Sequence, residues 1–175
     1  SDTVTLNNKS TGTIKSPNAI FIGAGSNWEI DNYGDIYSTS AKAINIRGGD
    51  NTKITNRSDA KIRTDEQNAI LMQDSASDDP SETLTLDNYG SVSAKYNAVK
   101  IAVNSTGATI NNYSGATIQS PGGLYSVLLN SGSTVTIYNE GEISAVNNNY
   151  AIACQTCANV GITNSGTVTA GGTIS

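Results

Sequence analysis

Hydrophobic and polar residues follow a unit of about 24 residues that recurs seven times along the chain. Each copy contains an apolar anchor, and consecutive anchors are 24, 24, 32, 24, 27 and 25 residues apart. The anchors are Leu6, Ile30, Ile54, Leu86, Ile110, Ile137 and Ile162. A fixed period of this length is the signature of repeat units that stack on one another. The longest interval indicates an insertion loop, over residues 73–82.

Three short strands are predicted in each unit. Apolar and polar residues alternate around the anchor, as in a strand with one buried face, and only Thr52 breaks the apolar column two places before it. A second apolar position follows six or eight residues after the anchor. The first six units add a third apolar segment, from Ile20 and Ile22 to Ile152 and Cys154 as inward pairs. We therefore predict an all-β parallel β-helix of about seven three-strand rungs, forming one domain over residues 1–175.

Asparagine occupies the second position after the anchor in every unit. The column is Asn8, Asn32, Asn56, Asn88, Asn112, Asn139 and Asn164. Stacked rungs lie about 4.8 Å apart, so these side chains are predicted to form a ladder of amide hydrogen bonds. Asparagine also tolerates a left-handed backbone, which we expect at this corner. Because a residue repeated once per rung serves the stack, we assign the column a structural role.

A glycine precedes the second apolar position in most units. These residues are Gly12, Gly34, Gly90, Gly115, Gly141 and Gly166, and Ala60 is the exception. Glycine adopts positive φ without a steric cost, so the column predicts a turn with positive φ.

The charge balance and the absence of histidine argue against several classes of function. Lys and Arg total 10 against 15 Asp and Glu, and His is absent. This balance argues against nucleic acid as a partner, because duplex binding needs clustered cations. No Ser/His pair, phosphate loop or convergent set of carboxylates is present, so we expect no catalytic residues, no cofactor and no metal ion. No apolar run is long enough to cross a bilayer, and no signal peptide is evident, so any export signal is expected outside this chain.

The pattern I-x-N-x-G-x-I followed by N-A-I-x-I, as in IDNYGDI and NAIFI, resembles the passenger domains of Gram-negative autotransporters of the adhesin and autoaggregation types. The resemblance implies a right-handed β-helix that is secreted to the bacterial surface through an outer-membrane barrel outside this chain. It also implies a virulence-related role in adhesion or self-association, with a second copy, a host surface or a glycan as partner. The alternative is a glycan-binding or glycan-degrading β-helix, similar to tailspikes or polysaccharide lyases.

The two ends of the repeat support the idea of a fragment. The chain starts inside its first rung and stops at GGTIS, where another strand is due. Because a stacked coil leaves strand edges at both ends, we expect neighbouring rungs or a capping partner in a longer passenger.

The sequence CQTC offers three readings, which are a redox pair, half of a zinc site and a small disulfide loop. No helix is predicted there, and the chain has no further Cys or His to complete a zinc site. A structural disulfide between Cys154 and Cys157 is the favoured reading in an exported protein. A free pair of thiols and a redox role stay open.

The insertion loop contains a cluster of acidic residues, Asp74, Asp78, Asp79 and Glu82. Carboxylate oxygens in such a cluster suit calcium, although the spacing fits no EF-hand. A solvated acidic loop is the favoured interpretation. As an insertion on a regular stack, the loop is also a place where function could be added.

Two outward faces are candidate interaction surfaces. One column, three places after each anchor, includes Tyr33, Arg57, Tyr89 and Tyr113, and we expect cation–π stacking there that either stiffens the coil or contacts carbohydrate. The other face lies on the third strands, at Phe21, Asn45, Leu71, Lys100, Leu128 and Ala153, with a flank of Ala19, Ala43, Ala69, Ala98, Ser126 and Ala151. This apolar face predicts self-association. Asp35 and Lys61 are also expected to form an ion pair between successive rungs.

Overall fold

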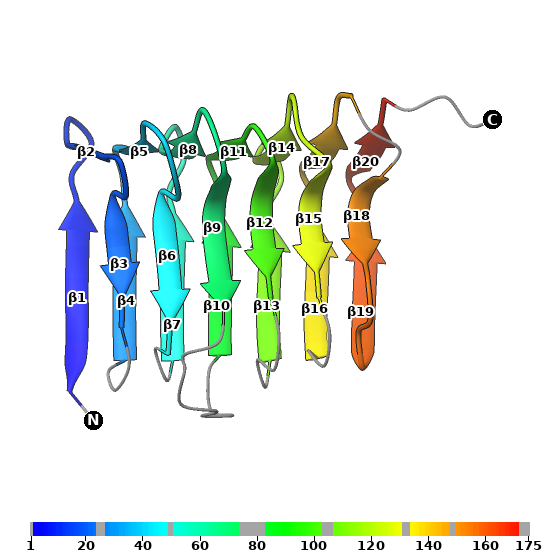
Figure 1. The fold of residues 1–175 in the computed structure, drawn as a ribbon, viewed down its shortest axis with the longest axis horizontal. Coiled ribbons are helices and arrows are strands. Elements are labelled where there is room, and N and C mark those ends of the chain that lie inside the picture. Colours follow the sequence, from blue (N-terminus) through cyan, green and yellow to red (C-terminus); the bar gives the residue numbers. More distant parts are fainter. Residues whose placement is uncertain are drawn as a thin grey trace.

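The computed structural model describes residues 2–23, 27–48, 51–73, 83–102, 107–130, 134–147 and 150–171. These residues form twenty β-strands and contain no helix (Figure 1). In this described part, no helix has the length and hydrophobicity that a membrane crossing requires. The strands build three parallel sheets, in which each strand pairs with its counterpart in the neighbouring unit. The fold is therefore a parallel β-helix, as predicted.

The first sheet, sheet A, holds the strands that carry the anchors. They are β1 (Thr3–Asn8), β4 (Asn27–Asn32), β7 (Asn51–Asn56), β10 (Thr83–Asn88), β13 (Gly107–Asn112), β16 (Thr134–Asn139) and β19 (Asn159–Asn164). Sheet B holds β2 (Thr13–Ser16), β5 (Asp35–Ser38), β8 (Lys61–Thr64), β11 (Ser91–Ala94), β14 (Thr117–Ser120), β17 (Glu142–Ala145) and β20 (Thr167–Ala170). Sheet C holds β3 (Ile20–Ile22), β6 (Ile44–Arg47), β9 (Asn68–Gln73), β12 (Asn97–Ile101), β15 (Tyr125–Leu129) and β18 (Tyr150–Cys154).

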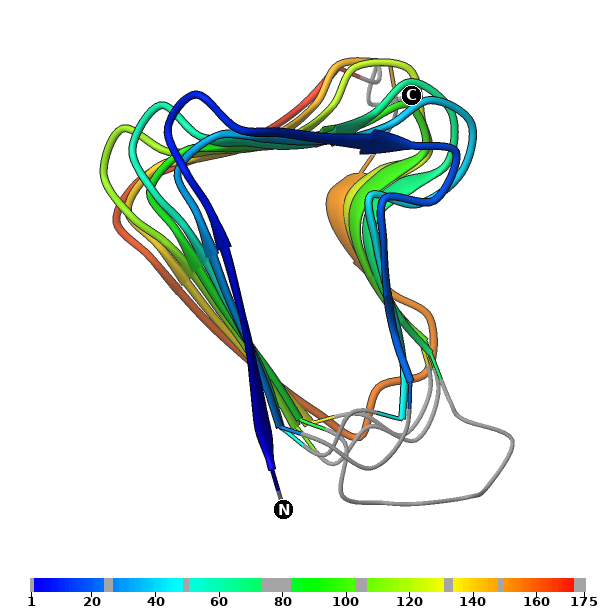
Figure 2. The same ribbon diagram turned by 90° about the vertical axis from the view of Figure 1, so that its left-hand side faces the viewer.

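The coil is right-handed. Seen from the N-terminal end, the chain runs up β1, across β2 and down β3, and this clockwise path recedes from the viewer with each rung (Figure 2). Six rungs have all three strands, and the described residues of the seventh supply only β19 and β20. The predicted coil of about seven rungs, with a third strand in the first six units, therefore appears among the described residues as six complete turns and a partial one.

The interior is filled by columns of aliphatic side chains. Ile30, Ile54, Leu86, Ile110 and Ile137, the central anchors, are at most 1% exposed. Burying a side chain of this size contributes about 1.5–3 kcal/mol relative to leaving it in water, so the columns supply most of the driving force for stacking. Burial weakens in the last described rung, where Ile162 is 50% exposed because no described strand lies over it.

The asparagine column forms the predicted ladder along the corner between sheets A and B. From Asn8 to Asn164, each Nδ2 donates to the Oδ1 of the next asparagine over 2.7–2.9 Å. The first six members are at most 5% exposed. The expectation of a left-handed backbone was wrong, because the ladder residues end extended strands and none has positive φ. Their amides also bond main-chain oxygens, as Asn32 does to Lys61 O at 3.0 Å.

The glycine column serves close approach rather than positive φ. Among the glycines named from the sequence, only Gly115 has positive φ, at 82°. A Cβ on Gly90 would lie 2.4 Å from two carbonyl oxygens of the preceding rung, and one on Gly34 would lie 2.2 Å from Gly12 O. The short turns need glycine because a side chain has no room there. Ala60 and Ala116 are accommodated in longer turns.

The corner between sheets B and C is closed by hydroxyl groups. Ser38 Oγ donates to Pro17 O over 2.6 Å, and Thr64 Oγ1 donates to Ala41 O over 2.9 Å. Ser120 Oγ donates in the same way to Tyr96 O over 2.7 Å. Each hydroxyl satisfies a carbonyl of the preceding rung, so this corner also avoids buried polar groups without partners.

Candidate functional site

One outward column of side chains follows the asparagine ladder along the first corner, between sheets A and B. We name it the corner ladder, and it consists of Lys9, Tyr33, Arg57, Tyr89, Tyr113, Glu140 and Ser165. From Tyr33 onward, each backbone N–H donates to the carbonyl oxygen of the ladder asparagine one rung earlier, over 2.7–2.9 Å. This bonding fixes the spacing of the column at the distance between strands, about 4.8 Å.

Arg57 links two rungs of the corner ladder. Its Nε and Nη2 donate to the two carboxylate oxygens of Asp31 over 2.6 and 3.1 Å, and its guanidinium carbon lies 5.3 Å from the centre of the Tyr33 ring. The hydrogen bond from Arg57 holds the pKa of Asp31 below its ordinary value, and the same bond raises the pKa of Arg57. A bidentate pair keeps both planar groups in one orientation, which also places the cation against the Tyr33 ring.

Tyr89 and Tyr113 stack face to face. Their ring centres are 4.1 Å apart and the ring planes differ by 3°. The hydrogen bond with Tyr89 is the main reason why the pKa of Tyr113 is raised, to about 12. Tyr33 is 42% exposed and Tyr89 is 38% exposed, so the ladder offers aromatic surface to solvent. The predicted Tyr and Arg stacking is therefore present as two separate pairs.

A second outward ladder lies on sheet B, and sequence reasoning missed it. Lys15 Nζ lies 5.2 Å from the centre of the Tyr37 ring, and the Arg63 guanidinium carbon lies 3.9 Å from it. The Tyr37 hydroxyl donates to Asp65, and this bond raises the pKa of Tyr37. All three ladder residues directly follow the second apolar position of their unit, so the repeat alignment contained the signal that could have found them.

Asp35 pairs with Arg63 rather than with Lys61. Asp35 and Lys61 are neighbours in the register of β5 and β8, as expected. The carboxylate of Asp35 nevertheless accepts from Arg63 Nη2 over 2.8 Å, and no ion pair joins it to Lys61 among the described residues. The prediction of an Asp35–Lys61 pair was wrong. Arg63 lies diagonally opposite Asp35, and its forked guanidinium group donates two hydrogen bonds to the carboxylate, which the ammonium group of Lys61 cannot match.

The face of sheet C that was expected to drive self-association is largely covered. Leu71 and Leu128 are 4% and 6% exposed, and the register places Lys100 between them, so stacked neighbours flank both leucines. Phe21 is 58% exposed because it ends its column with a neighbour on one side only. The flanking alanines, among them Ala98, belong to the core rather than to the outer face. The prediction of a flat apolar face was therefore wrong except at Phe21.

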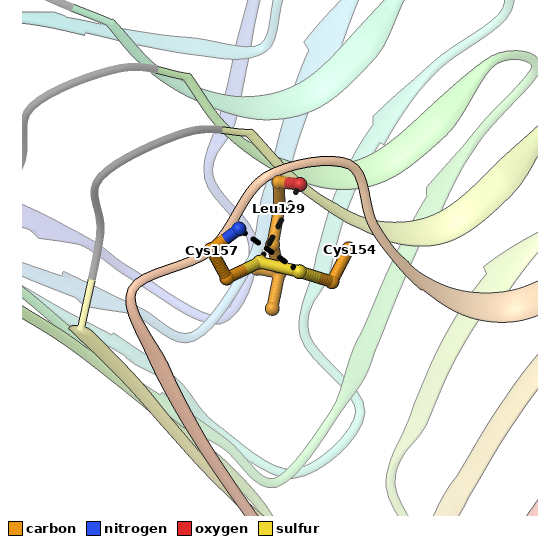
Figure 3. Close-up of a disulfide and its surroundings, with 3 residues drawn as sticks. All are labelled: Leu129, Cys154 and Cys157. Atoms are coloured by element: carbon orange, nitrogen blue, oxygen red, sulfur yellow. Dashed lines mark hydrogen bonds between the residues drawn. A yellow bond between two sulfur atoms is a disulfide. The ribbon is translucent and has the colours of Figure 1, made fainter.

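Cys154 and Cys157 are joined by a disulfide at the end of β18 (Figure 3). The Cys157 N–H donates to Cys154 Sγ over 3.2 Å, and Cys157 Sγ lies 3.9 Å from Leu129 O in the preceding rung. Cys157 packs partly against the core, whereas Cys154 is exposed. The register pairs Cys154 with Leu129, a fully buried member of the inward column, which agrees with the expected inward position. Cys154 is exposed because β18 is the last strand of sheet C and no described strand lies over it.

The remaining candidates concern metal binding. The acidic residues Asp74, Asp78, Asp79 and Glu82 lie outside the described residues. Within the described ranges, no group of three or more Cys, Asp or Glu side chains is arranged to hold a metal ion.

Comparisons with protein-family models, with curated proteins and with solved structures return no match. Fold and surface geometry therefore carry the functional argument.

Proposed function

We propose that this chain is a rigid, non-catalytic rod that serves in adhesion or self-association at the surface of bacterial cells. The observation that carries the proposal is the corner ladder, which presents Tyr33, Arg57, Tyr89 and Tyr113 from consecutive rungs. Binding normally costs conformational entropy, because long side chains become ordered in the complex. In the corner ladder the ion pair of Arg57 and the stacking of the tyrosine rings already order these side chains in the free chain, so this cost is reduced. A pre-ordered aromatic and cationic surface is typical of recognition sites.

The β-helix suits a mechanical role. Three continuous sheets, a filled interior and the asparagine ladder connect every rung to the next, so the rod resists bending and local opening. Its outward groups recur at the strand spacing of about 4.8 Å. A periodic surface is complementary to a periodic partner, which can be a glycan chain or a second copy of the rod.

Display of the chain on non-adherent bacterial cells tests the proposal. Displaying cells are expected to clump or to adhere to glycan-coated surfaces, and the double substitution Tyr33→Ala and Tyr89→Ala is expected to remove most of this adhesion. Tyr138→Ala is the matched control, because Tyr138 is 49% exposed on sheet A but lies outside the corner ladder. Absence of adhesion by the wild-type chain, at verified display levels, would contradict the proposal.

The exposed tyrosine rings also favour a second candidate, a glycan-binding or glycan-degrading β-helix, because sugar rings stack on aromatic faces. Incubation of the chain with acidic and neutral polysaccharides separates the two candidates. The non-catalytic rod is expected to leave them uncut, so new reducing ends would support the glycan-degrading alternative.

A further inference from the structure

The turns at the first corner alternate in length from rung to rung. The first, third and fifth rungs have two additional residues each, which are Ser10 and Thr11, Ser58 and Asp59, and Ser114 and Gly115. All six are exposed. The three long turns close with the same hydrogen bond, which is Gly12 N to Lys9 O at 2.7 Å in the first of them. These turns form three ridges that project beyond the short turns at the upper left of Figure 2.

The short turns form the floors of two grooves between these ridges. The groove over the second rung has a volume of about 360 Å³ and includes Tyr33 and Asp35. The groove over the fourth rung has a volume of about 420 Å³ and includes Tyr89 and Ser91 at the equivalent positions. The third-rung ridge, with Asp59, is a wall of both. Volumes above about 300 Å³ are in the range of small-molecule sites.

The lining of the grooves is rich in hydroxyl groups and contains one tyrosine in each groove. Ser58, Ser114 and Thr117 border the fourth-rung groove together with Tyr89. Hydroxyls both donate and accept hydrogen bonds, and an aromatic ring packs against apolar C–H faces. Sugars present these same two kinds of surface, alternating hydroxyls and C–H faces.

We propose that the two grooves are a paired binding site for a neutral, linear polysaccharide, with one disaccharide unit in each groove. The grooves are two rungs apart, about 9.6 Å, which is comparable to the length of an extended disaccharide. This inference rests on the proposed adhesive function and names the partner of the corner ladder.

Charge favours a neutral glycan over an acidic one. Asp59 and Lys61 offset each other in both grooves, and the carboxylate of Asp35 is already paired with Arg63 at 2.8 Å. The chain as a whole carries a net charge of -5, which repels an acidic polymer.

An extended peptide is a poorer fit than a glycan. Peptides that bind β-structures usually add a strand to an open sheet edge. At the groove floors the backbone N–H groups already donate to the preceding rung, as Asp35 N does to Gly12 O over 3.0 Å and Ser91 N does to Ala60 O over 2.9 Å. The grooves therefore lack the free main-chain partners that strand addition needs.

Removing a ridge tests the proposal without disturbing the core. Deleting Ser58 and Asp59 and replacing Ala60 by glycine converts the third-rung turn into the short form that the second and fourth rungs already use. This variant loses the wall shared by both grooves. Deleting only Ser10 and Thr11 is the matched control, because it opens the second-rung groove and leaves the fourth-rung groove closed.

Calorimetric titration with cellobiose, cellohexaose, maltohexaose and hexagalacturonate gives the readout. Cellohexaose is expected to bind the wild-type chain about 10- to 100-fold more tightly than cellobiose, because it occupies both grooves. The Ser58 and Asp59 deletion is expected to abolish binding of both. The Ser10 and Thr11 deletion is expected to make the affinity for cellohexaose similar to that for cellobiose, and to reduce the number of cellobiose molecules bound per chain from two to one.

Three outcomes would overturn the inference. They are a folded third-rung deletion that binds cellohexaose as the wild-type chain does, tighter binding of hexagalacturonate than of cellohexaose, and no binding of either cellohexaose or maltohexaose at millimolar concentration. Adhesion of displaying cells distinguishes this failure from failure of the proposed function. If adhesion persists and still depends on Tyr33 and Tyr89, the adhesive role stands without the grooves.

Discussion

Replacing Asn88 by alanine removes the central member of the asparagine ladder. Asn88 is fully buried, accepts from Asn56 Nδ2 over 2.8 Å and donates to Asn112 Oδ1 over 2.8 Å. The substitution removes the ladder partner of Asn56 Nδ2 and of Asn112 Oδ1, and it also removes the bonds that Asn88 makes with Thr117 O and with Gly90 N. An unpaired buried polar group costs about 1–3 kcal/mol, so we expect the free energy of unfolding to fall by about 2–6 kcal/mol.

Asn164→Ala is the matched control at the last position of the same ladder. Asn164 is exposed and accepts one bond, from Asn139 Nδ2 over 2.7 Å. Asn139 Nδ2 keeps its bond to Thr167 O over 3.1 Å, just as Asn56 Nδ2 keeps its bond to Ser91 O over 3.1 Å, but at the exposed Asn164 end water can replace the lost partner. We therefore expect Asn164→Ala to cost no more than about 1 kcal/mol.

Urea titration followed by circular dichroism measures both losses, and the fluorescence of Trp28, the one tryptophan, provides a second probe. Coincident transitions justify a two-state treatment, which stacked repeats do not always obey. Equal destabilisation by the two substitutions, or a loss below about 1 kcal/mol for Asn88→Ala, would refute the claim that buried amide pairing stabilises the stack.

Three further predictions concern single residues. Gly90→Ala puts a Cβ 2.4 Å from two carbonyl oxygens and is expected to lower the free energy of unfolding, measured by urea titration, by about 1–3 kcal/mol. Gly161→Ala is the control and should cost far less, because a Cβ there meets nothing within 4 Å, so equal losses would contradict the close approach at Gly90. Thr52 Oγ1 is buried without a hydrogen-bond partner among the described residues, so Thr52→Val should raise the free energy of unfolding by about 1 kcal/mol, and a lower melting temperature would count against this. The pKa of Tyr113 is raised from 10.0 to about 12, so the unfolded chain loses this proton first and stability should fall as pH rises from 10 to 12. Phenolate absorbance should show a late-titrating fraction from Tyr113 and Tyr37, whose pKa is also raised, and uniform titration of all tyrosines near pH 10 would contradict this.

Most of the fold could be predicted from the sequence because the units repeat. Positions that recur once per unit, such as Ile54 and Asn56, must stack in a parallel coil, so their burial and their ladder followed from spacing alone. The turn geometry did not follow, because glycine at Gly90 is compatible with either positive φ or close approach. Only the position of the carbonyl oxygens in the preceding rung decides between them.

The outward surface was less predictable than the core. Register identifies neighbours, but side-chain length and rotamer decide which of them pair, and Asp35 therefore selects Arg63 over Lys61. Alternation along the strand predicted an exposed Leu71, yet this side chain is only 4% exposed. The spacing of six or eight residues already contained the alternation of long and short turns, but only the three-dimensional structure shows that the long turns enclose grooves.

Distances between spin labels along the corner ladder test the stacked coil most directly. Lys9, Glu140 and Ser165 are exposed members of this column in the first, sixth and seventh rungs. With labels attached without cysteine chemistry, pulsed electron resonance is expected to give about 24 Å from Lys9 to Glu140 and about 29 Å from Lys9 to Ser165, which correspond to five and six strand spacings. A Lys9–Ser165 distance equal to or shorter than the Lys9–Glu140 distance would contradict a coil in which each unit lies directly over the last.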